Sequence, residues 1–209
     1  IVDIYNKSDK VYLGALDDAS LDVDIITDDM IGSTDFSVYS FILVGDGVLK
    51  NAKYIPDMPM ILVNAKHAHH FGFLKGGRVK SLGANANLMV DSEGVVQVYS
   101  STSVKLGGPA LTYNYLPQKF MSSGVINFAS TVTSEKNKMG SVIAFNQNKG
   151  SCFFGISETK FWNDNSFELF NECLKFVSGV HDVRVNSDTD NSVNGIRIKD
   201  VVLNQYLLS

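Results

Sequence analysis

Two apolar runs, YSFILVGDG at residues 39–47 and MPMILVN at residues 58–64, give the clearest indication of the fold. Each run has the length of one strand and is apolar almost throughout. Such strands are typical of parallel sheets, which are buried on both faces. The runs therefore predict two strands of a parallel sheet, separated by a loop around Pro56 and Pro59.

The flanking segments alternate between strand-like and helix-like patterns. Towards the amino terminus, strands are expected at IVDIYN (residues 1–6) and DVDIIT (residues 22–27), with a helix compatible with SDKVYLGAL (residues 8–16). Residues 71–128 form short segments rich in Gly, Ser and Asn, which indicate an inserted or edge β region. Two further strands are expected within residues 138–157, around a turn from Asn146 to Gly150, because Asn and Gly tolerate the backbone of a tight reversal.

The strongest helix signal follows these strands. Asn165 is expected to cap the helix, with Glu168 three residues later as in a capping box. Gly179 is expected to end it. Between them, apolar residues fall on one face of the helix: Phe167, Phe170, Cys173, Leu174 and Val177.

The predicted fold is an α/β domain over residues 1–179, with a mostly parallel, flavodoxin-like sheet flanked by helices. Residues 180–209 alternate apolar and polar side chains around Asn194–Gly195, a pattern typical of antiparallel strands. This segment is too short to bury a core alone. We expect it to form either a β-hairpin appended to the domain or the start of a β-sandwich module.

Composition excludes some classes of function. The 18 basic and 22 acidic residues give a net charge of -4, and the basic residues are scattered, which argues against nucleic-acid binding. Apolar runs are all shorter than the roughly 20 residues that span a bilayer, so no membrane insertion is expected. The acidic stretch from Asp17 to Asp29 lacks the spacing of a calcium loop and is expected to be a solvated face.

The chain has two cysteines, and each lies in apolar surroundings. Cys152 lies at the end of a predicted strand, and Cys173 lies on the apolar face of the predicted helix. The favoured interpretation is two buried free thiols, and the alternative is a single disulfide.

The order of elements resembles the class I glutamine amidotransferase-like superfamily, especially its ThuA-like branch. Three stretches carry the resemblance after the first strand, helix and strand: YSFILVGDGVL from residue 39, PMILVNAKHAHHFG from residue 59 and CFFGISETKFWNDNSFELFNECLKFV from residue 152. It covers about residues 1–178. The resemblance implies an amidotransferase-like sheet with helices on both faces.

Two departures from the family pattern concern catalysis. The resemblance implies a nucleophile elbow after the fourth strand, but this chain has Asn64, Ala65, Lys66 and His67 there, without Cys or Ser. The family's late His and Glu correspond to the stretch GISETKFW (residues 155–162). Glu158 stands at the position of the Glu, but Ile156 or Ser157 stands where the family has the His. Without a nucleophile and its base, amidotransferase activity is not expected.

Any ligand is expected at the carboxyl ends of the parallel strands, where the predicted fold brings three loops together. The candidate ligand-binding residues are Gly45, Asp46, Gly47, Asn64, Lys66, His67, Glu158 and Trp162. The Gly45–Gly47 loop could present backbone N–H groups to an anion or form an ordinary turn. Trp162 could stack on a sugar or pack against the adjoining helix.

A metal site is the alternative at the same loops. His67, His69 and His70 could supply imidazole ligands, with Asp46 or Glu158 completing the set. The competing interpretation is that these histidines are polar residues of a loop. If the histidines are ordinary loop residues, no cofactor is expected. If they form a metal site, the cofactor is a divalent metal.

The leading functional hypothesis is a non-catalytic binding or structural module of an extracellular or cell-surface protein. Missing catalytic residues, loops rich in Asn and Ser, and the first residue, Ile1, favour it over a cytoplasmic protein. Its partners would be other modules of the same polypeptide, a neighbouring subunit or a carbohydrate. The alternatives are a metal-dependent hydrolase or carbohydrate-active enzyme, and a self-assembling surface subunit that pairs strands of residues 180–209.

Overall fold

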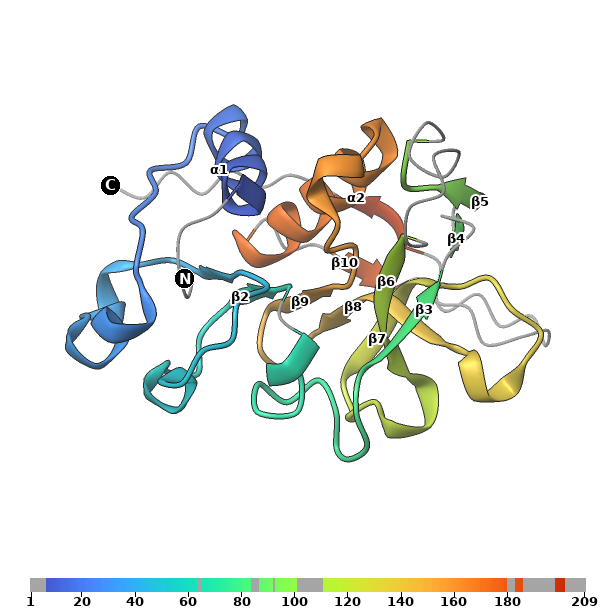
Figure 1. Ribbon diagram of the computed structural model, residues 1–209, viewed down its shortest axis with the longest axis horizontal. Helices are drawn as coiled ribbons and strands as arrows, with labels where there is room; N and C mark the ends of the chain where they lie inside the picture. Colours follow the sequence, from blue (N-terminus) through green and yellow to red (C-terminus); the bar gives the residue numbers. More distant parts are fainter. Residues whose placement is uncertain are drawn as a thin grey trace.

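The computed structural model describes residues 7–63, 65–83, 87–91, 93–100, 111–179, 183–185 and 198–201 (Figure 1). The strand expected at residues 1–6 lies outside these ranges.

Two α-helices, α1 (Lys7–Asp18) and α2 (Asp164–Val177), accompany a sheet of short strands. Both helices lie where the sequence predicts them. The strands are β1 (Ile42–Val44), β2 (Met60–Leu62), β3 (Lys80–Gly83), β4 (Asn87–Val90), β5 (Gly94–Gln97), β6 (Thr112–Pro117), β7 (Val125–Thr131), β8 (Gly140–Asn146), β9 (Ser151–Phe154), β10 (Val183–Val185) and β11 (Ile198–Val201). The 3-10 helices are η1 (Asp28–Ser33), η2 (Phe36–Val38), η3 (Ala52–Tyr54), η4 (Ala65–His67), η6 (Gln118–Phe120), η7 (Lys136–Lys138) and η8 (Thr159–Phe161).

The main sheet has the strand order β1-β2-β9-β8-β7-β4-β5, and β6 pairs with both β8 and β3. Only β1 with β2 and β2 with β9 pair in parallel among the described strands. The other pairs of this sheet are antiparallel. The architecture is therefore mixed α/β, and the expectation of a mostly parallel sheet was wrong for the described residues. Short connections such as the one between β8 and β9 explain the antiparallel pairs, because a tight turn can join only antiparallel strands.

The segment DVDIIT does not form the expected strand. Residues 21–26 have no regular secondary structure, and Thr27 leads into η1. Of its apolar side chains, Ile26 is buried, whereas Val23 and Ile25 are exposed. The strand predicted at residues 22–27 is thus wrong, and the irregular segment that replaces it buries Ile26 alone among these three apolar side chains.

Two hydrophobic cores lie on opposite faces of the central strands. Alternate side chains divide between the cores: Ile61 and Phe154 belong to one, and Leu62 and Phe153 to the other. Helices α1 and α2 cover the first face, and Figure 1 shows both on the same side of β2 and β9. The 3-10 turns and loops of residues 26–74 cover the second face. The strands are therefore buried on both faces, as the apolar runs predicted, but within the described residues α-helices cover only one of them.

A disulfide joins Cys152 of β9 to Cys173 of α2, with a Cα–Cα distance of 5.6 Å. Both side chains are fully buried. The favoured interpretation of two free thiols was wrong, and the alternative of one bridge is correct. Phe170, Cys173, Leu174 and Val177 of the predicted apolar face pack in the same core as β9, which brings the two sulfur atoms together. Phe167, the fifth residue of that face, is 38% exposed.

The N-cap of helix α2 lies earlier in the chain than predicted. Its N-cap is Asn163, whose side chain accepts a hydrogen bond from the Ser166 backbone N–H at 3.2 Å. Asn165, the predicted cap, instead donates to the Gln97 carbonyl oxygen at 2.8 Å. Gly179 follows the helix with φ of 79°, which agrees with its predicted role at the end.

Strands β10 and β11 pair in antiparallel fashion, as the alternation within residues 180–209 predicted. The Asn194–Gly195 turn and most of this segment lie outside the described residues. Within the described part of the chain, neither helix has the length and hydropathy of a membrane span.

Candidate functional site

The carboxyl ends of β1, β2 and β9 lie at one edge of the sheet, because these three strands are adjacent and parallel. The loops that leave this edge follow Val44, Leu62 and Phe154, the last residues of the three strands. These are the three loops that the sequence predicted to converge. Asn64 itself lies outside the described residues.

The loop after β1 starts at Gly45, which is buried, and turns outward at Asp46, which is exposed. Val44 still belongs to the sheet, since its carbonyl oxygen accepts a hydrogen bond from the Val63 N–H at 2.9 Å. Protein atoms around the Asp46 carboxyl displace part of its hydration and raise its pKa, while a hydrogen bond from its own backbone acts in the opposite direction. The exposed carboxylate remains available to a ligand at this edge.

Three side chains hold the rest of this loop through its backbone. The Leu49 N–H donates to Nε2 of His67 at 3.2 Å. The Asn51 N–H donates to the carboxylate of Asp28 at 3.0 Å, and the Asn51 side chain adds two more bonds to Asp28. Further along, Nε2 of His70 lies 3.2 Å from the Ala52 carbonyl oxygen. The loop after β1 is thus tied to η1 on one side and to the loop after β2 on the other.

Asp28 is a residue whose role the sequence did not reveal. It is 7% exposed, although the acidic stretch containing it was expected to be solvated. Its carboxylate and carbonyl satisfy the backbone and side chain of Asn51, which lies 23 residues away in the chain. No local pattern relates these two residues, so only the tertiary structure could identify the pair.

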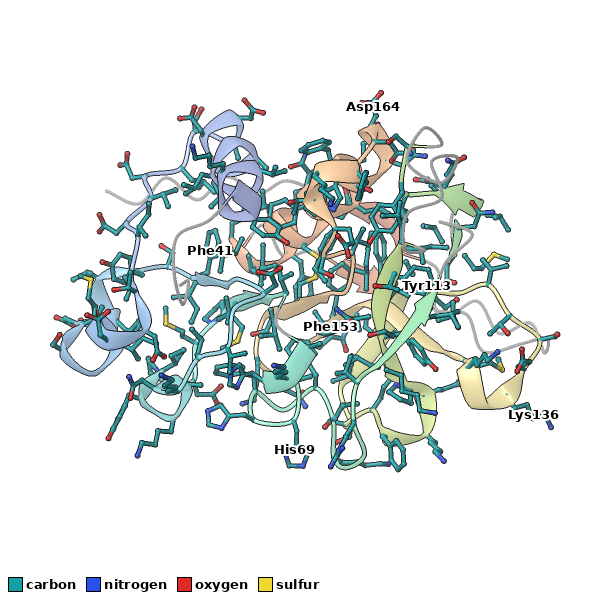
Figure 2. All side chains as sticks on the ribbon, in the orientation of Figure 1. Phe41, His69, Tyr113, Lys136, Phe153 and Asp164 are labelled. Carbon is teal, nitrogen blue, oxygen red and sulfur yellow. A yellow bond between two sulfur atoms is a disulfide. The ribbon has the colours of Figure 1, made fainter. Side chains whose placement is uncertain are left out.

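The three histidines do not gather around a common point. His67 and His70 each direct Nε2 at a backbone group of the loop after β1. His69 is exposed, and Figure 2 shows it pointing away from the body of the molecule. No group of three or more His, Cys, Asp or Glu side chains in the described residues is placed to hold a metal ion.

The environment of His67 disfavours its protonated form. Burial lowers its pKa, and the neighbouring His70 and Lys66 lower it further, while Asp28 acts in the opposite direction. The neutral ring with a proton on Nδ1 leaves Nε2 as an acceptor, which is the form that the Leu49 N–H requires.

The loop after β9 is packed against two other strands. The Gly155 N–H donates to the Val142 carbonyl oxygen, and its own carbonyl accepts from the Asn114 N–H, each at 2.8 Å. The Asn114 side chain then donates to Oγ of Ser157 at 3.4 Å and accepts from Oγ of Ser81 at 2.7 Å. Glu158 follows and is half-buried. The loop therefore presents Ser157 and Glu158 from a rigid base.

Trp162 belongs to the core and not to the ligand site. It is 8% exposed, and its ring packs against Tyr12, Phe154 and Phe170. The indole N–H donates to the Ile156 carbonyl oxygen at 3.0 Å. The idea that Trp162 stacks on a sugar was wrong, because both the ring and its polar atom are engaged within the protein.

The chain contains no free thiol, because its two cysteines form the disulfide. A sulfur nucleophile of the amidotransferase type is therefore absent at every position.

No protein-family model matches this sequence. A search of curated proteins likewise finds no match.

Proposed function

We propose that this chain is a non-catalytic binding module of an extracellular or cell-surface protein, built on a mixed α/β sheet. The disulfide between Cys152 and Cys173 is the observation that carries the proposal. It consumes both thiols, which removes nucleophilic catalysis by sulfur. It also favours an oxidising compartment, because structural disulfides are rare in the cytosol.

The proposed binding surface is the edge formed by the loops after β1, β2 and β9. Asp46 and Lys66 are exposed there, and Glu158 is half-buried. Charged groups of both signs, which can also form hydrogen bonds, suit a polar ligand such as a carbohydrate, or a polar surface of a neighbouring module. Residues 45–52, held by Asp28, His67 and His70, would present Asp46 without large rearrangement on binding.

The catalytic part of the proposal is tested with the purified chain, secreted into an oxidising medium. Alkylation in denaturant without reduction is expected to label neither Cys152 nor Cys173 in mass spectra, and incubation of the folded chain with glutamine is expected to release no ammonia. Labelled thiols or glutamine turnover would overturn the proposal.

The binding part is tested on an array of immobilised glycans. The variant Asp46→Asn combined with Glu158→Gln is expected to lose at least about tenfold in affinity for any glycan that the native chain retains, since each charged hydrogen bond contributes about 1.5–3 kcal/mol. Asp57→Asn is the matched control, because Asp57 is an exposed acid that pairs with Lys149 instead. Equal losses in both variants would contradict this site.

A further inference from the structure

Two imidazoles three residues apart bind the same loop with opposite hydrogen-bonding roles. His67 accepts the Leu49 N–H at Nε2, so its Nε2 carries no proton. His70 faces the Ala52 carbonyl oxygen with the same atom, and a carbonyl can only accept, so Nε2 of His70 carries the proton. Added acid therefore affects the two contacts differently.

We propose that His67 is a proton-sensitive clasp, which holds the backbone of Leu49 in the loop after β1 while its ring is neutral and releases Leu49 on protonation. Protonation places a hydrogen on Nε2, so the imidazolium has two N–H donors and no acceptor. The Leu49 N–H and the new Nε2–H then point at each other. The His70 contact survives the same change, because an additional proton on Nδ1 leaves its Nε2–H in place.

The groups around His67 set the pH at which the clasp opens. Within the described residues, the charged and titratable neighbours are Asp28 from η1, Lys66 from η4 and His70 from the following turn. Burial is the largest influence and lowers the pKa of His67, with His70 and Lys66 acting in the same direction and Asp28 opposing them.

The sign of the pH dependence follows from this shift. The unfolded or open form takes up the proton near the ordinary pKa of about 6.5, whereas the closed form takes it up at lower pH. Stability of the closed loop is therefore full above about pH 6.5 and falls as the pH drops below that value. A mildly acidic compartment would loosen the loop after β1 at Leu49. This consequence for ligand release rests on the proposed function, but the clasp itself does not.

The clasp is tested in the free chain by NMR, without any ligand. At pH 7.5 the ring nitrogen shifts are expected to show the Nδ1–H tautomer for His67 and the Nε2–H tautomer for His70. On lowering the pH to about 5, the exchange protection of the Leu49 amide, corrected for intrinsic exchange, is expected to fall by about tenfold or more. The amide of Val63, bonded within the sheet to Val44, serves as an internal reference.

Two variants separate the clasp from general acid sensitivity. His67→Gln keeps an acceptor of similar reach and is expected to retain Leu49 protection at both pH values. His70→Gln keeps a donor for Ala52 and is expected to respond to acid as the native chain does. An Nε2–H tautomer at His67, native protection that does not change with pH, or an unchanged acid response in His67→Gln would overturn the proposal. Failure of the glycan test would leave these results unaffected.

Discussion

At the scale of single residues, Gly155 decides how closely three backbones meet at the candidate site. A Cβ on this residue would overlap the carbonyl oxygen of Asn114 and press on that of Val142. Both atoms are backbone, so neither can move aside without disturbing β6 or β8. The glycine therefore allows the loop with Ser157 and Glu158 to leave the sheet where it does.

The variant Gly155→Ala is expected to lose about 2–3 kcal/mol of unfolding free energy, because overpacking against a fixed backbone cannot relax. Urea denaturation followed by circular dichroism measures the loss. Gly14→Ala is the control, since a Cβ there meets no atom within 4 Å and Gly14 lies inside α1. This control is expected to gain about 0.5–1 kcal/mol from helix propensity. A neutral Gly155→Ala would show that the described packing is incorrect.

The sequence located His67 correctly at the end of β2 but not its role. A histidine near a strand end is compatible with a metal ligand, a ligand contact or a backbone acceptor. The choice depends on Leu49, which lies 18 residues earlier in the chain. Such a partner becomes visible only when the loops after β1 and β2 are placed together.

At the scale of elements, the spacing of apolar residues predicted α2, but several neighbouring residues could have formed its N-cap. Asn163, Asn165 and Ser166 can all serve near a helix start. Both side-chain amides donate to the Gln97 carbonyl oxygen at the end of β5, but Asn163 also accepts the Ser166 N–H and is the cap. The bond to the Ser166 N–H, and not the contact with β5, therefore distinguishes the two asparagines.

The cap assignment predicts different costs for two similar substitutions. Asn163→Ala removes the bond to the Ser166 N–H and a second bond to Gln97, and is expected to destabilise the chain by about 1–2 kcal/mol. Asn165→Ala removes only the bond to Gln97, which is partly exposed, and is expected to cost about 0.5 kcal/mol. Thermal unfolding of both variants measures the difference. A larger loss in Asn165→Ala would restore the cap first predicted from the sequence.

At the scale of the whole molecule, the disulfide joins the parallel strands to the helix that covers them. It closes a loop with a sequence separation of 21 residues. In the chain-entropy model a loop of this length contributes about 3 kcal/mol, mainly by restricting the unfolded state. The candidate site depends on this support, because β9 carries both Cys152 and the loop that leads to Glu158.

Replacing both cysteines, as Cys152→Ala with Cys173→Ala, is expected to lower the melting temperature by roughly 6–12 °C, from the loss of about 3 kcal/mol in a chain of this size. Calorimetry of the oxidised native chain and of the double variant measures the shift. Adding a strong reductant during unfolding is expected to lower the melting temperature of the native chain and leave the double variant unchanged. Equal responses to the reductant would contradict a disulfide in the folded protein.

The sequence by itself determined the elements whose signals are local. Continuous apolar runs predicted β1 and β2, a 3.6-residue period predicted α2, and an Asn- and Gly-containing turn predicted the hairpin of β8 and β9. These signals act between near neighbours in the chain, where the geometry of strand, helix and turn relates spacing to position.

Tertiary structure alone decided the features that join distant residues. These are the antiparallel majority of strand pairs, the cover of one face by turns, the disulfide, and the contacts of Asp28 and His67 with the loop after β1. Each depends on which segments become neighbours when the chain closes, and the free energy that selects those neighbours comes from burying both faces of one sheet. A local sequence pattern does not determine which distant segments become neighbours, because the same residues could serve in several arrangements.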